Sequence, residues 1–222
     1  FMFVVLIFAV ILALMFYALK SRAAIKTYNT IVILPNFLSM VLIAYIVYAF
    51  LNPVSGILNK FLAFCGKTEM TDWYSKPEAW PTILTIVKVW QSIGMQSIIY
   101  YASLMSIDES LFEAAEIDGA SKMQQIWYIS LPHLVPVMTI QTILAFGGIF
   151  SGDFGLFYQT TMNVGTLYPT TDIINTYVFR GLKNGNMSVS GAIGLVQSVL
   201  GLIMVVAVNK IVQKISPENS LF

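Results

Sequence analysis

Long apolar runs alternate with short polar segments along this chain. The runs that are both apolar and long lie at 1–19, 30–51, 82–104, 133–150 and 188–209. A helix that crosses a membrane needs about 20 mainly apolar residues, and in lipid a helix satisfies its own backbone hydrogen bonds. The pattern therefore predicts an all-α, polytopic membrane helix bundle with five visible transmembrane helices.

Composition supports a membrane protein and excludes several other classes. Hydrophobic residues make up 57% of the 222 residues, charged residues only 10%, and mean hydropathy is +0.77. A soluble domain carries about 25% charged residues. The net charge of +1 gives no basic field for nucleic acid. The single cysteine, Cys65, and single histidine, His133, exclude a disulfide framework and the usual multi-histidine or cysteine-rich metal sites.

The first 19 residues are uncharged and begin at Phe1. A signal peptide carries a positive segment before its apolar core, so this stretch is expected to be a full transmembrane helix. One further helix is expected to precede it. Without repeats or low-complexity segments, residues 1–222 are interpreted as one transmembrane domain.

Lysine and arginine counts give a weak orientation. One side would hold Lys20, Arg22, Lys26, Lys122, Lys210 and Lys214, and the other Lys60, Lys67, Lys76, Arg180 and Lys183. Cytoplasmic loops carry the excess of these residues, most strongly near helix ends. The first set lies closer to the ends, so loop 106–136 is expected in the cytoplasm. Loops 51–81 and 151–187 are then external.

Loop 106–136 carries signals for two short helices joined by Gly119. Asp108 is a favourable N-cap for the first helix, and Gly119 suits the left-handed position that ends it. Ser121, followed by Gln124, forms the capping box of the second. Two prolines are expected to stop that second helix and begin the next span: Pro132 and Pro136.

The first of these helices is acidic, which bears on where it lies. It carries Glu113 and Glu116, with Asp118 following. A short amphipathic helix can lie flat on a membrane, but an anionic inner leaflet repels acidic residues. An acidic helix with an apolar face is better suited to a socket on another protein.

The residues of this loop resemble the EAA motif of binding-protein-dependent ATP-binding-cassette permeases. The matching residues are Glu113-Ala114-Ala115, Asp118-Gly119-Ala120, Trp127, Ile129, Leu131-Pro132 and Pro136. Trp127 is a mild departure, since the family more often has Phe there. The surrounding chain, as far as the tail Ile215-Ser216-Pro217-Glu218, is similar to the oligosaccharide-uptake permeases of the maltose and LplB type.

The resemblance implies a type I importer permease in a bacterial cell membrane, with a sixth helix before the visible five. The loop would be the coupling helix, docked on an ATPase subunit through Glu113, Ala114, Ala115, Asp118, Gly119 and Ala120. The implied partners are a second homologous permease in a heterodimer, two cytoplasmic ATPase subunits, an extracellular or periplasmic solute-binding protein and an oligosaccharide. ATP and Mg would be bound by the ATPase subunits and no cofactor by this chain.

The chain shows no ATP site of its own. A phosphate-binding loop reads G-x-x-x-x-G-K-[ST]. Gly66-Lys67-Thr68 imitates its end, but Phe61 stands where the first glycine is needed. No nucleophile, base and acid set is recognisable, and His133 beside Pro132 suits an interfacial role. The chain is therefore expected to be a transport subunit and not an enzyme.

Polar residues gather on one face of the run 82–104. They are spaced at i, i+3, i+4, i+7 and i+8: Lys88, Gln91, Ser92, Met95 and Gln96. Charged residues within a span are costly and usually face a cavity or a neighbouring helix. A solute pathway and a polar seam between helices both fit. In the resembling family the matching stretch contributes to the sugar site.

Three further residues are candidates for the solute pathway. Asn36 follows Pro35 early in the second run, Asp153 follows a glycine-rich segment, and Gln197 lies beside the small residues of the last run. Asp153 equally suits an N-cap. In loop 151–187, Thr171 or Asp172 is expected to cap an amphipathic helix reaching Arg180. Tryptophan and tyrosine side chains suit interfacial anchors: Trp73, Trp80, Tyr158 and Tyr168.

The leading hypothesis is thus a permease subunit of an ATP-driven oligosaccharide importer. Alternatives are a permease for a non-sugar solute, a membrane-embedded enzyme and a non-transporting scaffold subunit. An enzyme would need clustered His, Asp or Glu within the spans, and a scaffold would not need the polar face of 82–104. Lys88 would suit an acidic saccharide such as a uronate, but one lysine does not decide the cargo.

Overall fold

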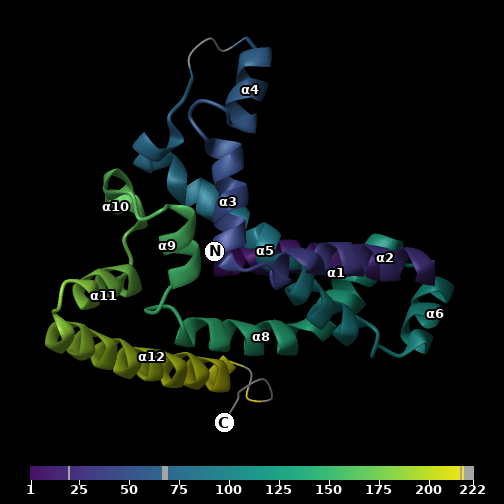
Figure 1. The fold of residues 1–222 in the computed structure, drawn as a ribbon. Coiled ribbons are helices and arrows are strands. Elements are labelled where there is room, and N and C mark those ends of the chain that lie inside the picture. The colour runs from purple at the N-terminus through teal and green to yellow at the C-terminus, as the bar shows by residue number, and fades with distance from the viewer. Residues whose placement is uncertain (20, 67–69, 216, 218–222) are drawn as a thin grey trace. The chain divides into compact units, whose positions relative to one another are not determined.

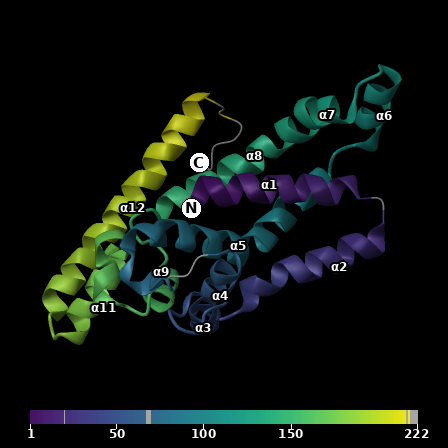
Figure 2. The same ribbon diagram turned by 90° about the horizontal axis from the view of Figure 1, so that it is seen from above.

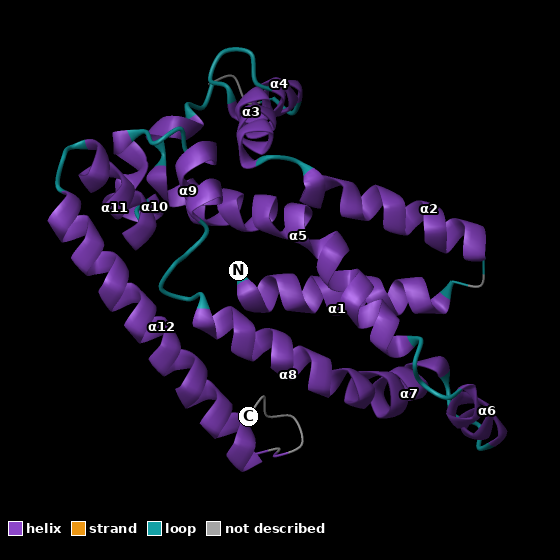
Figure 3. Cartoon of the chain, turned by 60° about the horizontal axis from the view of Figure 1, so that its bottom comes forward, coloured by secondary structure: helices purple, strands orange, loops and turns teal. Residues whose placement is uncertain are grey.

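The fold is helical throughout the part of the chain that the computed structural model describes, which is residues 1–19, 21–66, 70–215 and 217 (Figure 3). The α-helices are α1 Met2–Ala18, α2 Arg22–Ile33, α3 Met40–Leu51, α4 Ile57–Phe64, α5 Trp80–Leu104, α6 Glu109–Ile117, α7 Lys122–Gln125, α8 Leu131–Gly147, α9 Phe154–Thr160, α10 Tyr168–Thr171, α11 Ile174–Lys183 and α12 Met187–Ile215. Short 3₁₀ turns and one π-helical segment join some of them. This confirms the predicted all-α fold.

Some residues named above lie outside the described part of the chain. They are Lys20 and Lys67, used for orientation, Thr68 of the glycine-lysine-threonine stretch, and Ser216 and Glu218 of the tail.

The helices form two compact units. Unit 1 comprises residues 1–37, 89–147 and 204–222, and unit 2 comprises 38–88 and 148–203. The single domain expected over 1–222 stays a prediction.

In unit 1, α1 packs on α8 and on the C-terminal part of α5 (Figure 2). The buried core combines small and large side chains: Ala9, Val10, Ala13, Tyr100, Leu104, Ile107 and Leu134. The alanines of α1 let its backbone approach its neighbours closely, as small residues do between membrane helices.

A second close approach in unit 1 joins α2 to α5 at Gly94. A Cβ atom placed on Gly94 would lie 2.1 Å from the carbonyl oxygen of Val32. Backbone atoms cannot yield as a flexible side chain can, so this crossing requires glycine.

In unit 2, α3 packs along α9, and α9 contacts α11 (Figure 1). Its core is built around Trp80, Leu84 and Leu156, each 0% exposed. The indole N–H of Trp80 donates to the carbonyl of Trp73 at 2.8 Å. Trp80 is therefore a core residue, and its expected role as an exposed interfacial anchor is wrong.

Asn59 ties together the segment between α3 and α5. Its side chain is 6% exposed. Its amide N–H groups donate to the carbonyls of Pro53 and Thr71, at 2.9 and 2.8 Å. Its Oδ1 accepts from the Trp73 indole at 3.1 Å and the Thr71 backbone at 3.4 Å. The buried side-chain amide of Asn59 thus holds the segment between α3 and α5 in place, and no sequence pattern predicted this role.

By length and apolar composition, two described helical stretches can cross a membrane, at 122–147 and 187–214. A third is reached if α2 and α3 count as one broken span. α1 is apolar, but its 17 residues are fewer than the about 20 of a typical crossing. α5, with 25 residues, is long enough to cross but is not among the helices that are also apolar enough by this criterion. Of the five transmembrane helices predicted, two, or three if the broken pair counts as one, meet this criterion among the described residues.

The expected single helix at 30–51 is wrong. α2 ends at Ile33, a 3₁₀ turn covers Leu34–Phe37, and α3 begins anew at Met40. Pro35 has no N–H to continue the helix. The hydroxyl of Ser39 accepts the Leu42 N–H at 3.3 Å and so caps the start of α3.

The prolines of the loop do not end its second helix, which corrects another expectation. From Lys122 the chain stays helical to Gly147, passing through a π-helical segment at Ile126–Ser130. A proline within a helix removes one hydrogen bond and crowds the carbonyl four residues earlier. The wider π turn directly before Pro132 relieves that crowding without breaking the helix.

We predict that Asn59→Ala destabilises the protein, because it leaves the Trp73 and Thr71 donors and two carbonyls without their partner. Each buried unsatisfied group costs about 1–3 kcal/mol, so the thermal midpoint of the detergent-purified protein should fall by several degrees. Asn184→Ala, at an exposed asparagine, is the matched control and should leave the midpoint unchanged. Equal midpoints for the two variants would contradict the role given to Asn59.

Candidate functional site

Helix α6 of unit 1 begins at a well-formed cap. The Asp108 carboxylate accepts the Ser110 N–H at 3.0 Å. This backbone hydrogen bond lowers the pKa of Asp108 below its ordinary value. Glu109 in the first turn adds a favourable charge at the positive end of the helix dipole. The N-cap predicted for Asp108 is confirmed.

The C-terminal end of α6 is closed by a Schellman motif. The Ala120 N–H donates to the Ala115 carbonyl at 2.8 Å, and the Gly119 N–H donates to the Glu116 carbonyl at 3.1 Å. This pair of bonds requires a left-handed residue just past the helix, and Gly119 has φ +78°. The distance in sequence between the Glu-Ala-Ala and Gly-Ala parts of the motif is therefore the one that these two hydrogen bonds need. The chain turns at Gly119, directly after α6.

The motif side chains differ in exposure. Glu113, Ala114, Asp118 and Gly119 are exposed, whereas Ala115 and Ala120 are half-buried. α6 is attached to unit 1 through Phe112, whose ring centroid lies 5.7 Å from that of Tyr17 in α1. The acidic face of α6 thus points outward while one aromatic side chain holds the helix in place.

The next turn is fixed by polar contacts. Ser121 and Gln124 form the predicted capping box, and Lys122 forms an ion pair with Glu116. Ser106 Oγ and His133 Nε2 lie 3.2 Å apart, which joins the two ends of the loop. His133 is exposed at this junction, and its interfacial role stays a prediction.

In unit 2, two residues proposed separately for the solute pathway form an ion pair. Lys88 Nζ lies 2.7 Å from Asp153 Oδ2, and about a quarter of each side chain is exposed. The other oxygen of Asp153 accepts the Leu156 N–H at 3.0 Å. Asp153 is therefore both the N-cap of α9 and the partner of Lys88.

The remaining pathway candidates are placed as follows. In unit 2, Gln197 is buried and donates to the Phe150 carbonyl at 2.6 Å and to Asn175 Oδ1 at 2.9 Å. In unit 1, Gln91 is buried, Ser92 is half-buried and Met95 is 41% exposed. Asn36 lies in the 3₁₀ turn after α2. Within the described part of the chain, Lys88 and Asp153 are the two candidates that the fold brings together as an ion pair.

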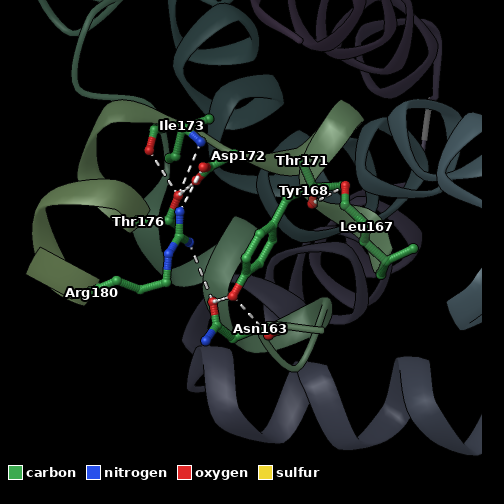
Figure 4. Close-up of polar contacts among 8 residues, drawn as sticks. All are labelled: Asn163, Leu167, Tyr168, Thr171, Asp172, Ile173, Thr176 and Arg180. Carbon is green, nitrogen blue, oxygen red and sulfur yellow. Dashed lines mark hydrogen bonds and ion pairs between the residues drawn. The ribbon is translucent and has the colours of Figure 1, made fainter. Parts of the chain in front are cut away.

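A polar cluster lies around Arg180 of α11 (Figure 4). Arg180 Nη2 donates to Asp172 Oδ2 at 2.6 Å, and Nη1 donates to Asn163 Oδ1 at 3.4 Å. The guanidinium carbon lies 4.2 Å from the centroid of the Tyr168 ring, a cation–π contact. The Thr176 hydroxyl donates to Asp172 Oδ1 at 2.6 Å.

These contacts set the charges of the cluster. Burial raises the pKa of Asp172, but hydrogen bonds from Arg180 and Thr176 outweigh it and hold that pKa below its ordinary value of 3.8. The hydrogen bond to Asp172 raises the pKa of Arg180. Both groups stay charged at neutral pH.

The N-cap of α11 differs from the expectation. It is Ile173, whose N–H donates to the Thr176 hydroxyl at 3.0 Å. Thr171 ends α10 and donates to the Leu167 carbonyl, while Asp172 is held by Arg180. Because both polar side chains have other partners, neither caps α11.

Comparison with known proteins places these features in a family. The family model for binding-protein-dependent transport system inner membrane components matches residues 3–217. This chain belongs to that family.

Curated relatives of this family member include two proteins of Bacillus subtilis (strain 168). The polygalacturonan/rhamnogalacturonan transport system permease protein YteP is 30% identical over 95% of this chain, and protein LplB is 28% identical over 94%. The sn-glycerol-3-phosphate transport system permease protein UgpA of Escherichia coli O157:H7 is 27% identical over 82%. The chain spans 65% of the length of each Bacillus relative and 60% of UgpA.

Solved structures agree with this assignment. A chain of a bacterial ABC transporter involved in the import of the acidic polysaccharide alginate matches with a TM-score of 0.88 and 32% identity. The match covers 94% of this chain and 72% of that one. A second structure shows the alginate transporter in complex with an alginate pentasaccharide-bound periplasmic protein, with a TM-score of 0.89, 32% identity and coverage of 95% and 73%. The fold is that of an ABC importer permease embedded in a membrane.

Three features of these sites were not anticipated from the sequence. The Lys88–Asp153 pair joins residues 65 positions apart, so no local pattern reveals it. Arg180 and Asp172 are eight positions apart, a spacing of about two helical turns that gives a weak local signal. The π-helical segment Ile126–Ser130 was also unexpected, and Pro132 and Pro136, which come after it, are its only signal in the sequence.

We predict that Asp172→Asn destabilises unit 2 in a pH-dependent way. Because the native pKa of Asp172 is lowered, its stabilising contribution is present above the ordinary value of 3.8 and is lost as pH falls below it. The variant should be less stable than the wild type at pH 7, by about 1 kcal/mol or less for such a partly exposed pair. In thermal unfolding of the purified protein, the gap should begin to narrow near pH 3.8 and close as pH falls further, through the lowered native pKa of Asp172. A gap that stays constant over this range would contradict the assignment.

Proposed function

We propose that this chain is a transmembrane subunit of an ATP-driven importer that takes up oligosaccharides delivered by a solute-binding protein. The observation that carries the proposal is the construction of loop 106–136. It presents a capped, acidic helix closed by a Schellman motif at Gly119. Membership of the transport family and the named cargoes of the relatives support it.

Loop 106–136 has the chemistry of a protein-docking element. Its exposed apolar side chains include Leu111 at 53% and Ile117 at 87%, beside the exposed carboxylate of Glu113. Clusters of exposed apolar residues mark contact sites. We propose that α6 docks on a cytoplasmic ATPase subunit, so that movement of the ATPases is transmitted to α5 and α8.

The proposed assembly contains a second homologous permease, two ATPase subunits that bind ATP and Mg, and an extracellular or periplasmic solute-binding protein. The complex would be a multi-pass assembly of the bacterial cell membrane, with loop 106–136 in the cytoplasm and loops 51–81 and 151–187 outside. Alternating access between inward-facing and outward-facing states would move the solute. This chain would form half of the pathway and carry no cofactor.

The solute pathway is proposed to include Lys88 and Asp153, with Asn36, Gln91, Ser92, Met95 and Gln197 as further members. The ion pair leaves no net charge at the Lys88 position. A carboxylate on the solute would therefore have to compete with Asp153 for Lys88. The named cargoes of YteP and of the alginate transporter are acidic polysaccharides, which makes a uronate-containing oligosaccharide the first cargo to test. A non-sugar solute is the second candidate for the cargo, because the relative UgpA is named for sn-glycerol-3-phosphate transport.

We predict that Glu113→Lys abolishes solute-stimulated ATP hydrolysis by the complete complex in lipid. The reversed charge would disrupt docking while the capped helix stays folded. Glu109→Lys makes the same change of charge on the same helix outside the motif, and it should retain most of the stimulation. If both variants lose solute-stimulated ATP hydrolysis, or if both retain it, docking through Glu113 is contradicted.

We predict that Asp153→Asn shifts uptake toward acidic oligosaccharides, because it removes the negative charge that faces the Lys88 ammonium while an amide oxygen can still cap α9. Lys88→Gln should shift uptake the opposite way. A partly exposed charge interaction of up to about 1 kcal/mol corresponds to a change of about 2- to 5-fold in the ratio of acidic to neutral uptake. The measurement is competitive uptake of a galacturonate trisaccharide against a neutral trisaccharide of equal length. If both variants lower both uptakes in proportion, the pair is structural and not part of the pathway.

A further inference from the structure

A shallow hollow of about 310 Å³ opens at the C-terminal end of α11 in unit 2. Its lining residues are all polar, aromatic or glycine: Asp172, Tyr177, Arg180, Gly181, Asn184 and Asn186. They come from a single stretch of 15 residues in unit 2, from Asp172 to Asn186. None of these residues belongs to the coupling loop or to the proposed solute pathway.

The charged side of the hollow is held in a fixed geometry. Arg180 is fixed by Asp172 at 2.6 Å and by the Tyr168 ring, whose centroid lies 4.2 Å from the guanidinium carbon (Figure 4). Asp172 is further held by the Thr176 hydroxyl. A guanidinium has five N–H donors, and the described contacts of Arg180 use two of its nitrogens. A rigid carboxylate and guanidinium side by side present acceptors and donors whose positions are set before a ligand arrives.

The open side of the hollow adds an aromatic ring and amides. Tyr177 precedes Arg180 by one helical turn and is 55% exposed. Asn184 and Asn186 are exposed on the turn that follows α11. Gly185, between them, has φ +81° and so allows that turn. The hollow therefore offers one ring face together with several hydrogen-bonding groups.

The lining chemistry narrows the class of ligand. A phosphate or sulfate group would face the Asp172 carboxylate, and the one cation present is already neutralised by it. An apolar ligand would find no aliphatic side chain in the lining. A metal ion needs several acidic, histidine or cysteine ligands, and no group of three occurs among the described residues. An uncharged ring with many hydroxyl groups fits the lining of the hollow. Its C–H face can pack on the tyrosine ring, and its hydroxyls can form hydrogen bonds with the carboxylate, guanidinium and amide groups.

We propose that this hollow is a binding site for a single pyranose unit of a saccharide, separate from the solute pathway. Its volume lies at the lower end of the roughly 300–1,000 Å³ range of ligand pockets, which suits one sugar ring. Tyr177 stacks on the ring, Asp172 and Arg180 bind neighbouring hydroxyls, and Asn186 contributes at the rim. Binding at such an open site is weak and rapidly reversible, so its function is local capture of saccharide and not tight recognition.

The test is saturation-transfer NMR with methyl galactopyranoside on the full-length protein in its purified complex, in lipid nanodiscs without ATP. We expect transfer to the sugar ring protons in the wild type and at least a 3-fold reduction in Tyr177→Ala and Asn186→Ala. Tyr128→Ala removes another exposed tyrosine, 80% exposed in the wild type, and should keep the full signal. Glycerol 3-phosphate as the probe should give no transfer sensitive to Tyr177.

Three results would overturn the proposal: no transfer in the wild type, equal transfer in wild type and Tyr177→Ala, or equal loss in Tyr128→Ala. Tyr177 and Asn186 are exposed, so unchanged thermal midpoints can show that both variants fold. Lys88→Gln should leave the signal intact, which separates this site from the pathway. Because no ATP or transport is involved, failure of the proposed importer function would not change the outcome.

Discussion

A chain with so few charges must give a partner to each charge that falls among apolar helices. Lys88 is the sharpest case, because it lies well inside the 25-residue helix α5. An unpaired ammonium in apolar surroundings is strongly disfavoured. Asp153 meets it at 2.7 Å and at the same time caps α9. One carboxylate thus connects α5 to the start of the next helix in unit 2, and the position of α9 depends on it.

The same rule organises the other polar positions. Asn59 satisfies the backbone of the loop between α3 and α5, and Asp172 holds Arg180 against Tyr168. In the loop between α5 and α8, the polar groups work differently. Asp108, Ser121 and Gly119 only close helix ends, which leaves Glu113 exposed and available to another protein.

Local rules predicted local structure well. The caps at Asp108 and Ser121 and the left-handed Gly119 follow from short-range hydrogen bonding, which neighbouring residues determine. Prediction was poorer where two local rules compete. Pro35 ends a helix, as proline usually does, whereas Pro132 is accommodated by a π turn. Pairings over long separations, such as Lys88 with Asp153, depend on the packing of α9 and leave no trace in the sequence pattern. The burial of Trp80 likewise follows from the core of unit 2 and not from its neighbours in sequence.

We propose that α6 is the element through which this chain would dock on an ATPase subunit. The most direct measurement is disulfide or bifunctional cross-linking from a cysteine placed at Ile117, which is 87% exposed, in the complete complex with Cys65 replaced by serine. A cysteine at Phe64, 90% exposed at the end of α4, is the matched control on the loop proposed to be external. We expect a cross-link from position 117 to the ATPase subunit, changed in yield by ATP, and none from position 64. A cross-link to the ATPase from position 64, with none from 117, would contradict the proposal.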